Sequence, residues 1–112
     1  MRGLQSAMAR TLSVSIPHDL TEAEVKTRLV NGVADARQKY PAYLKNAHET
    51  WNGNTMSFTA SMMGQTITGR IEVEAKHVNV HVDLPLLLAM LANKIRPQIE
   101  AEGRKLLEKP KG

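Results

Sequence analysis

The strongest constraint on this chain is the run from residue 51 to residue 88, in which turn residues recur at short intervals between apolar stretches. Glycine is followed by a polar residue at Gly53-Asn54 and Gly64-Gln65, and Ala75-Lys76 separates two further stretches. Loops this short force consecutive strands to pair antiparallel. We therefore predict a series of β-hairpins that leads directly into a long apolar C-terminal segment.

Apolar and polar residues alternate within these stretches, and they also alternate from residue 11 to residue 16. A period of two is typical of strands with one buried face. A hairpin turn at Gly53-Asn54 sets Trp51 opposite Met56. The same turn sets Glu49 opposite Phe58. We expect these four side chains on the core face of the sheet, with Ile71 and Val80 from later strands beside them.

A first helix is predicted between the first two strands. Thr21 followed by Glu24 forms a capping-box pattern, and Pro41 ends the segment. The predicted helix runs from Glu22 to Lys39. Its apolar residues recur at helical spacing along one stripe: Val25, Leu29, Val33, Ala36 and Tyr40.

A second helix is expected over residues 84–107, with Pro85 in its first turn, where a missing N–H costs little. Pro97 lies in the interior of this segment. We therefore expect a kink near Asn93 or Lys94, or a break into two helices. The predicted inner stripe consists of Leu84, Leu88, Leu91, Ile95, Ile99 and Leu106.

The order β-α-β-β-β-β-α predicts an α+β fold with a single curved antiparallel sheet and helices on one face, similar to a helix-grip fold. We expect the first strand to pair with the last strand, residues 78–82, because this removes one exposed edge. The predicted domain covers residues 11–108. A flexible leader, residues 1–10, precedes it, and a polar tail, residues 109–112, follows it.

Composition excludes several functions. The chain has no cysteine, which removes disulfides, thiolate catalysis and cysteine-based zinc sites. Its net charge of +4 comes largely from basic residues near the termini, so we expect no specific nucleic-acid binding. No segment reaches the roughly 18 apolar residues that a membrane span needs. We expect a cytoplasmic protein.

The last predicted strand carries a row of polar side chains, namely His77, Asn79, His81 and Asp83. Two imidazoles and a carboxylate could bind a divalent cation. Residues two apart on a strand stand about 7 Å from each other, however, which is too far for one small ion without a ligand from a neighbouring strand. We predict a solvated polar face with no metal and no cofactor.

Glu49 is the one carboxylate in an inward-facing set, and a carboxylate in an apolar setting could act as an acid or base. It has no evident partner in the sequence, so either it lies near an open rim of the sheet or the register differs. We predict no catalytic residue.

A pocket for an acyl chain is a further possibility, lined by Met56, Phe58, Met62 and Met63 together with Glu49, although methionines more often fill an ordinary core.

The beginning of the last helix is apolar on more than one side. Leu86, Leu87 and Met90 remain after the inner stripe is placed. They form either an exposed docking surface for a granule, a membrane interface or a second subunit, or they pack against the first helix. The sequence favours neither of these two alternatives over the other.

Six motifs carry a family resemblance, and they follow in this order: Ile16-Pro17-His18-Asp19-Leu20, Trp51-Asn52-Gly53-Asn54, Phe58, Met63-Gly64, Gly69-Arg70-Ile71-Glu72-Val73 and Asp83-Leu84-Pro85-Leu86-Leu87-Leu88. Over residues 11–108 the chain resembles a small bacterial family called putative polyhydroxyalkanoic acid system proteins. The resemblance implies a cytoplasmic protein associated with polyester storage granules, and it brings no catalytic residues. The pattern begins after Arg10, so either Met1 or Met8 is the start.

From the resemblance and the periodicity together we expect a non-enzymatic polyhydroxyalkanoate granule-associated or granule-regulatory protein. Its partners are then a polyester granule or a granule-associated protein, and a homodimer is possible. The alternative is a small carrier of a hydrophobic ligand, an acyl chain or a hydroxyalkanoate, bound between the sheet and the C-terminal helix. An enzyme centred on Glu49 is the third interpretation.

Overall fold

The computed structural model describes residues 9–44, 46–62 and 64–108. Five strands form the sheet: β1 (Ala9–Pro17), β2 (His48–Asn52), β3 (Thr55–Met62), β4 (Gln65–Val73) and β5 (His77–Pro85). The two longer helices are α2 (Glu22–Lys39) and α5 (Ala92–Leu106). Two single-turn helices, α3 (Pro41–Leu44) and α4 (Leu86–Ala89), join them to their neighbours in the chain.

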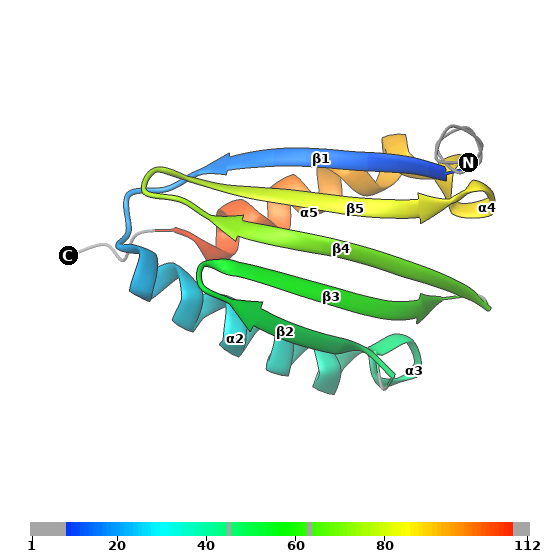
Figure 1. The fold of residues 1–112 in the computed structure, drawn as a ribbon, viewed down its shortest axis with the longest axis horizontal. Coiled ribbons are helices and arrows are strands. Elements are labelled where there is room, and N and C mark those ends of the chain that lie inside the picture. Colours follow the sequence, from blue (N-terminus) through cyan, green and yellow to red (C-terminus); the bar gives the residue numbers. More distant parts are fainter. Residues whose placement is uncertain (1–8, 45, 63, 109–112) are drawn as a thin grey trace.

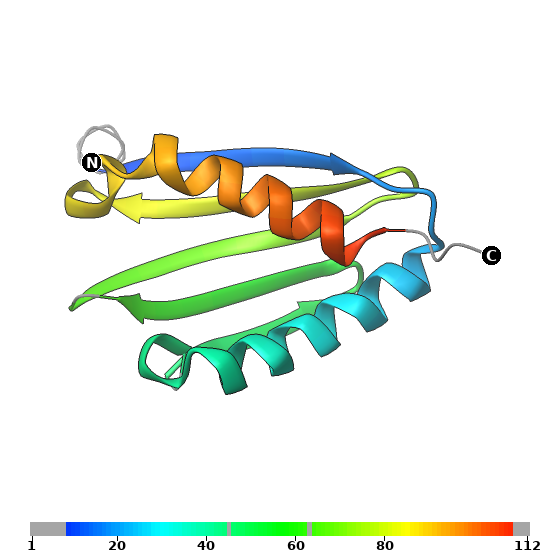
Figure 2. The ribbon, with the colours of Figure 1, turned by 180° about the vertical axis from the view of Figure 1, so that it is seen from behind.

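The strands form one antiparallel sheet in the order β1-β5-β4-β3-β2 (Figure 1). Both long helices cover the same face, α5 over the β1 side and α2 over the β2 side (Figure 2). The predicted α+β class, the single open sheet and the pairing of the first strand with the last are confirmed. Strand β1 begins at Ala9, two residues before the predicted strand.

The register of the first hairpin agrees with the prediction. Trp51 pairs with Met56, and Glu49 pairs with Phe58. Gly53 occupies the turn with a φ of 62°, in the left-handed region that glycine adopts without a steric penalty. Because side chains alternate along a strand, this register places all four paired side chains on the helix-covered face.

The core lies between the sheet and the two helices. Its most deeply buried large side chains are Leu12, Val25, Val78, Leu84 and Leu88. Trp51, Phe58 and Ile71 are partly buried and pack against this core, and Val80 belongs to it. The predicted inward orientation of these four side chains is therefore confirmed.

Helix α2 begins and ends where the sequence predicts. The Thr21 hydroxyl accepts a hydrogen bond from the Glu24 backbone N–H, and the Glu24 carboxylate accepts one from the Thr21 N–H. This reciprocal pair satisfies two of the N–H groups left open at a helix start. Along the predicted stripe, Val25 and Leu29 are buried, whereas Tyr40 at the far end is 56% exposed. The helix thus packs tightly at its beginning and loosely at its end.

The loop before α2 is held by His18, which is buried. Its Nδ1 accepts a hydrogen bond from the Leu20 backbone N–H at 3.1 Å, so the proton of the neutral ring lies on Nε2. Nε2 then donates to the backbone carbonyl of Glu74, 2.9 Å away in the β4–β5 loop. His18 therefore joins the entry to α2 to the neighbouring hairpin, which gives this histidine a structural role.

The C-terminal segment differs from the prediction. Strand β5 continues through Leu84 to Pro85, because these residues pair with the start of β1. Pro85 precedes α4 instead of occupying its first turn. The segment does break into two helices, which was one of the two predicted alternatives, but the break lies at Met90 and Leu91, ahead of Asn93. Helix α5 therefore begins at Ala92, and Pro97 falls early within it.

This break rotates the inner stripe. Leu91 is 38% exposed, contrary to the prediction, whereas Ala92 and Leu107 are buried. The physical reason is the turn that the chain makes between α4 and α5. Because α5 is a separate helix, its inward-facing positions do not continue the i, i+3, i+4 pattern of α4. Ile95, Ile99 and Leu106 remain partly buried against the core, as the stripe predicts.

Candidate functional site

The two long helices approach each other near the start of α2 and spread apart toward its end (Figures 1 and 2). At the close end, the Arg28 guanidinium donates to the backbone carbonyl of Leu106 at 2.9 Å and also to that of Glu108. At the spread end, the inner face of the sheet is covered less completely.

A cavity of about 230 Å³ lies at the spread end, under the last turns of α2. Its walls come from α2, α3 and the inner faces of β2, β3 and β4. The side chains that matter most for its chemistry are Val33, Arg37, Leu44, Glu49, Met56 and Phe58. The surface of the cavity is almost entirely apolar, and the polar residues that border it are Arg37, His48 and Glu49. A hollow of this kind is the usual form of a small-molecule site, although its volume is just below the common range of roughly 300–1,000 Å³.

Three of the five residues predicted to line a pocket border this cavity, namely Glu49, Met56 and Phe58. Met63 and the side chain of Met62 lie outside the described residues, so their part in the predicted pocket stays a prediction. The sequence did not indicate the contribution of α3. Leu44 enters the cavity wall because the chain makes one further helical turn after Pro41.

Glu49 has a partner that the sequence analysis missed. Arg37 on α2 binds it through two hydrogen bonds, Nη1 to Oε1 at 2.8 Å and Nη2 to Oε2 at 2.6 Å. Nη2 also donates to the Ala47 carbonyl at 2.6 Å. The hydrogen bond with Glu49 raises the pKa of Arg37 above its already high ordinary value, so the guanidinium stays charged. Glu49 is therefore a paired carboxylate beside the cavity, which explains why it faces inward.

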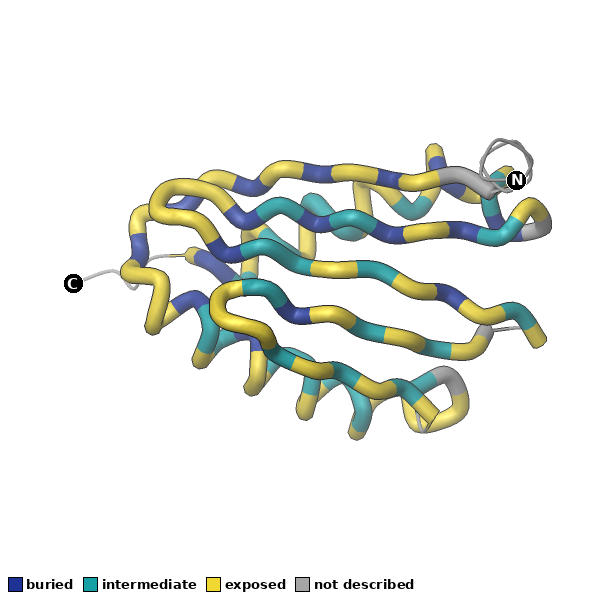
Figure 3. The backbone as a smooth tube through the Cα atoms, in the orientation of Figure 1, coloured by how far each residue is buried: buried dark blue, intermediate teal, exposed yellow. Residues whose placement is uncertain are grey.

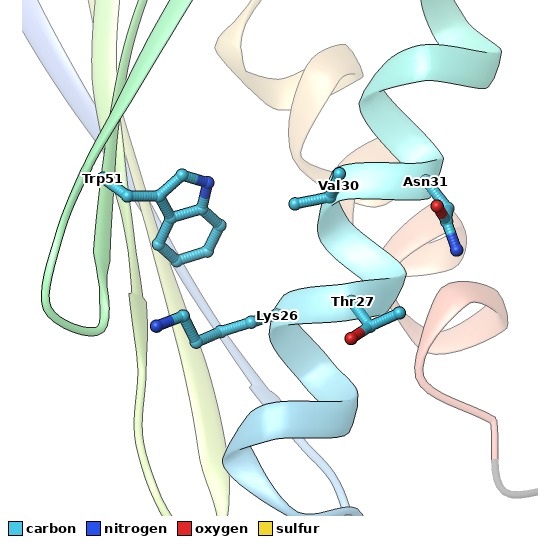
Figure 4. A pocket seen from close by; sticks show the side chains of 5 residues that line it. All are labelled: Lys26, Thr27, Val30, Asn31 and Trp51. Carbon is cyan, nitrogen blue, oxygen red and sulfur yellow. The ribbon is translucent and has the colours of Figure 1, made fainter.

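A second hollow lies between α2 and the edge strand β2. It is an open groove of about 310 Å³ lined by Lys26, Thr27, Val30, Asn31 and Trp51 (Figure 4). The Lys26 ammonium stands 5.2 Å from the centre of the Trp51 ring, within cation–π range, and donates to the Gly53 carbonyl at 3.0 Å. Lys26 thus fastens the start of α2 to the first hairpin. The groove is shallow and open to solvent.

The helix-free face of the sheet carries the polar row of β5. The His81 Nδ1 lies 2.8 Å from the Ser13 hydroxyl, and its Nε2 lies 3.1 Å from Glu72 Oε1. Asp83 accepts hydrogen bonds from Thr11 at 2.7 Å and from Thr68 at 3.3 Å. These contacts join β1, β5 and β4 across one face.

The order serine, histidine, glutamate matches the hydrogen-bond order of a hydrolytic triad. A triad also needs a pocket beside the nucleophile and donors for the oxyanion. Neither the cavity nor the groove borders Ser13. Among the residues that the structure describes, no group of three or more His, Asp or Glu side chains could hold a metal ion. That the chain binds no metal stays a prediction.

The predicted docking surface lies at α4. Leu86 is 60% exposed and Met90 is 84% exposed, and Leu91 stands beside them. Leu88, on the opposite side of the same turn, is buried and fixes α4 to the core. The side chain of Leu87 lies outside what the structure describes. We call Leu86, Met90 and Leu91 the α4 patch.

The fold and these sites define a small α+β protein whose open sheet is covered by helices on one face only. A family model with the description putative polyhydroxyalkanoic acid system protein matches residues 12–107. The chain belongs to this family. No curated protein and no solved structure matches it. Within the described part of the chain, no helix is long and apolar enough to cross a membrane.

Proposed function

We propose that this chain is a non-enzymatic, cytoplasmic protein of a bacterial polyester-storage system, and that it contacts the polyester granule through the α4 patch. The exposure of Leu86 and Met90 is the observation that supports the proposal. The family match supports the polyester system as its setting. A protein bound to the granule, or a second copy of the chain, is the alternative partner.

The size of the α4 patch is sufficient for such a contact. Three neighbouring large apolar side chains present on the order of a few hundred Å² together, the scale at which exposed patches usually mark interaction sites. At about 25 cal/mol per Å², covering them favours association by several kcal/mol before the entropy losses of binding are subtracted. Figure 1 places α4 at one end of the sheet, where the chain leaves β5.

The test replaces Leu86 and Met90 by serine in one protein. We expect this double variant to lose co-sedimentation with polyhydroxyalkanoate particles, because its docking surface has become polar. Its urea unfolding midpoint should change little, since both side chains are exposed. Sedimentation velocity of the unmodified protein, run in parallel, shows whether a second copy covers the patch instead.

A matched control removes exposed apolar side chains elsewhere. Val30 and Tyr40 on α2 are 53% and 56% exposed, so replacing both by serine makes a similar change away from α4. This control should keep its affinity for the particles. Equal loss of binding in both double variants would end the proposal, as would full binding by the α4 variant.

A second function is favoured by the cavity under α2. A small carrier of hydrophobic ligands needs an apolar hollow with a few polar groups at its wall, and the cavity has both. The observation that would favour an enzyme is a histidine beside Glu49 in a polar cleft. The partner of Glu49 is Arg37, and the cavity surface is almost entirely apolar, although His48, the neighbour of Glu49 on β2, also borders it.

A further inference from the structure

We infer that the cavity under α2 binds an acyl chain through its ester carbonyl and discriminates against the corresponding free acid. This inference rests on the second candidate function, the carrier of a hydrophobic ligand. The discrimination comes from the ion pair of Arg37 and Glu49, which borders the cavity together with His48.

The walls select an alkyl chain. The Met56 side chain is flexible, the Phe58 ring is flat, and Val33 is apolar like both of them. These side chains can pack against an alkyl chain without donating hydrogen bonds to it. A volume of about 230 Å³ corresponds to on the order of eight heavy atoms, when one water of roughly 30 Å³ stands for one atom. A chain of about eight carbons therefore fits better than a long lipid tail.

The polar end of the ligand is set by the unused donors of Arg37. A guanidinium has five N–H groups. Two of them bind Glu49 and one binds the Ala47 carbonyl. Within the described residues, the other two have no protein acceptor. The Arg37 side chain is 37% exposed, so it stands at the boundary between cavity and solvent. A ligand in the cavity can offer a carbonyl oxygen to these donors.

The charge of Glu49 then decides which carbonyl compound binds. Its carboxylate neutralises Arg37, so the pair presents N–H donors without a net positive charge. A second carboxylate, brought by a free acid, would lie close to Glu49 and repel it. An ester has the same carbonyl acceptor and no charge. The site should therefore prefer the ester.

The experiment measures the affinity of the full chain for methyl octanoate and for sodium octanoate at neutral pH, by calorimetry and by the intrinsic fluorescence of Trp51. We expect the ester to bind about tenfold more tightly, the ratio that about 1.4 kcal/mol produces. Replacing Ala36, in the cavity wall, by leucine should weaken both ligands, because it fills the same space.

Two variants separate charge from shape. Glu49→Gln leaves the Arg37 charge uncompensated, so octanoate should bind about tenfold more tightly than to the unmodified protein and equal or surpass the ester. Arg37→Gln removes the donors and should weaken the ester. Glu72→Gln removes a carboxylate from the ion pair with Arg70 on the other face of the sheet and should change neither affinity. Unfolding midpoints confirm that each variant is folded.

The outcomes are distinct. Failure of both ligands to bind the unmodified protein would end the carrier function together with this inference, and it would leave the granule-docking proposal intact. Binding of both ligands with equal affinity would keep the carrier function and overturn the ester preference. An ester preference that survives in Glu49→Gln would also overturn the inference, because the charge of Glu49 would then have no part in it.

Discussion

The two halves of this molecule differ in how closely they are packed. On the β1, β5 and α5 side, every inward position from Leu12 to Ile16 and from Val78 to Leu84 is buried. On the β2, β3 and α2 side, β2 has no buried residue, and Met56 is the one buried side chain among the described residues of β2 and β3. In Figure 3, dark blue segments recur along β1 and β5, whereas β2 shows only teal and yellow.

The difference indicates a division of tasks. The closely packed half excludes water and supplies most of the burial that stabilises the fold. The loosely packed half is held by polar contacts that reach across from α2, namely Arg37 to Glu49 and Lys26 to Gly53. These contacts fix the helix at two points and leave an apolar cavity beside one of them. A ligand could enter this half without disturbing the main core.

The largest expected effect compares the same substitution in the two halves. Leu84→Ala removes a side chain that is 1% exposed, so it should lower the free energy of unfolding by about 3–5 kcal/mol through lost burial and a new cavity. Leu44→Ala removes a half-buried leucine that already borders a cavity. It should cost about 1 kcal/mol. Urea unfolding monitored by circular dichroism measures both values.

Equal losses for these two variants would contradict the contrast between the halves. They would mean that α3 and the end of α2 are as well packed as the β1–β5 core. Because both changes delete the same atoms, intrinsic differences between side chains do not enter the comparison.

The features that the sequence predicted best are local ones, and they lie in both halves. Strict alternation in β1 and β5 identified their buried faces, and the need to protect an edge identified their pairing. The turn at Gly53-Asn54 fixed the register of the first hairpin for a similar local reason. Each of these features depends on the alternation of apolar and polar residues or on the residues of a turn, and both can be read from the sequence.

The candidate site was predicted less completely, because its contacts depend on how α2 is placed over the sheet. The sequence marked Glu49, Met56 and Phe58 as facing one side, and it did not indicate Arg37 as the partner of Glu49. Arg37 lies 12 residues away on a different element. Whether a helical residue meets a given strand residue depends on the rotation and tilt of the helix, which periodicity leaves open. The end of β5 was missed for a related reason, since its pairing with Ala9 extends it through Pro85.

A smaller effect is expected at the boundary between the halves, where Gly69 on β4 lies under the Phe58 ring. A Cβ at this position would run into that ring and into the backbone carbonyl of His81. Gly69→Ala should therefore lower the free energy of unfolding by about 1–3 kcal/mol, because a backbone atom cannot move aside as a side chain can. Differential scanning calorimetry measures the loss as a lower midpoint temperature.

Gly32 on α2 provides the control for this prediction. A Cβ there would come within 3.2 Å of the Leu106 side chain, which is flexible, and alanine favours a helix more than glycine does. Gly32→Ala should be neutral or slightly stabilising. A Gly69→Ala variant as stable as the unmodified protein would show that Phe58 and the β4–β5 ladder can rearrange, and the boundary would then belong to the loosely packed half.

The smallest expected effect concerns the polar face that joins β1, β5 and β4. The hydrogen bond with His81, followed by that with Arg70, lowers the pKa of Glu72 below its ordinary value of 4.5. A carboxyl group whose pKa is lower in the folded state stabilises the protein above its unfolded pKa, and this stabilisation is lost as the pH falls through the folded pKa. The unmodified protein should therefore be slightly more stable than Glu72→Gln near pH 7, and the difference should shrink below about pH 4.5. Urea midpoints at a series of pH values measure it. Repeating the comparison in a His81→Ala background should remove most of the pH dependence, because the main hydrogen bond is then absent. A difference that stays constant from pH 7 to pH 3 would mean that the carboxylate of Glu72 contributes nothing to stability through its charge.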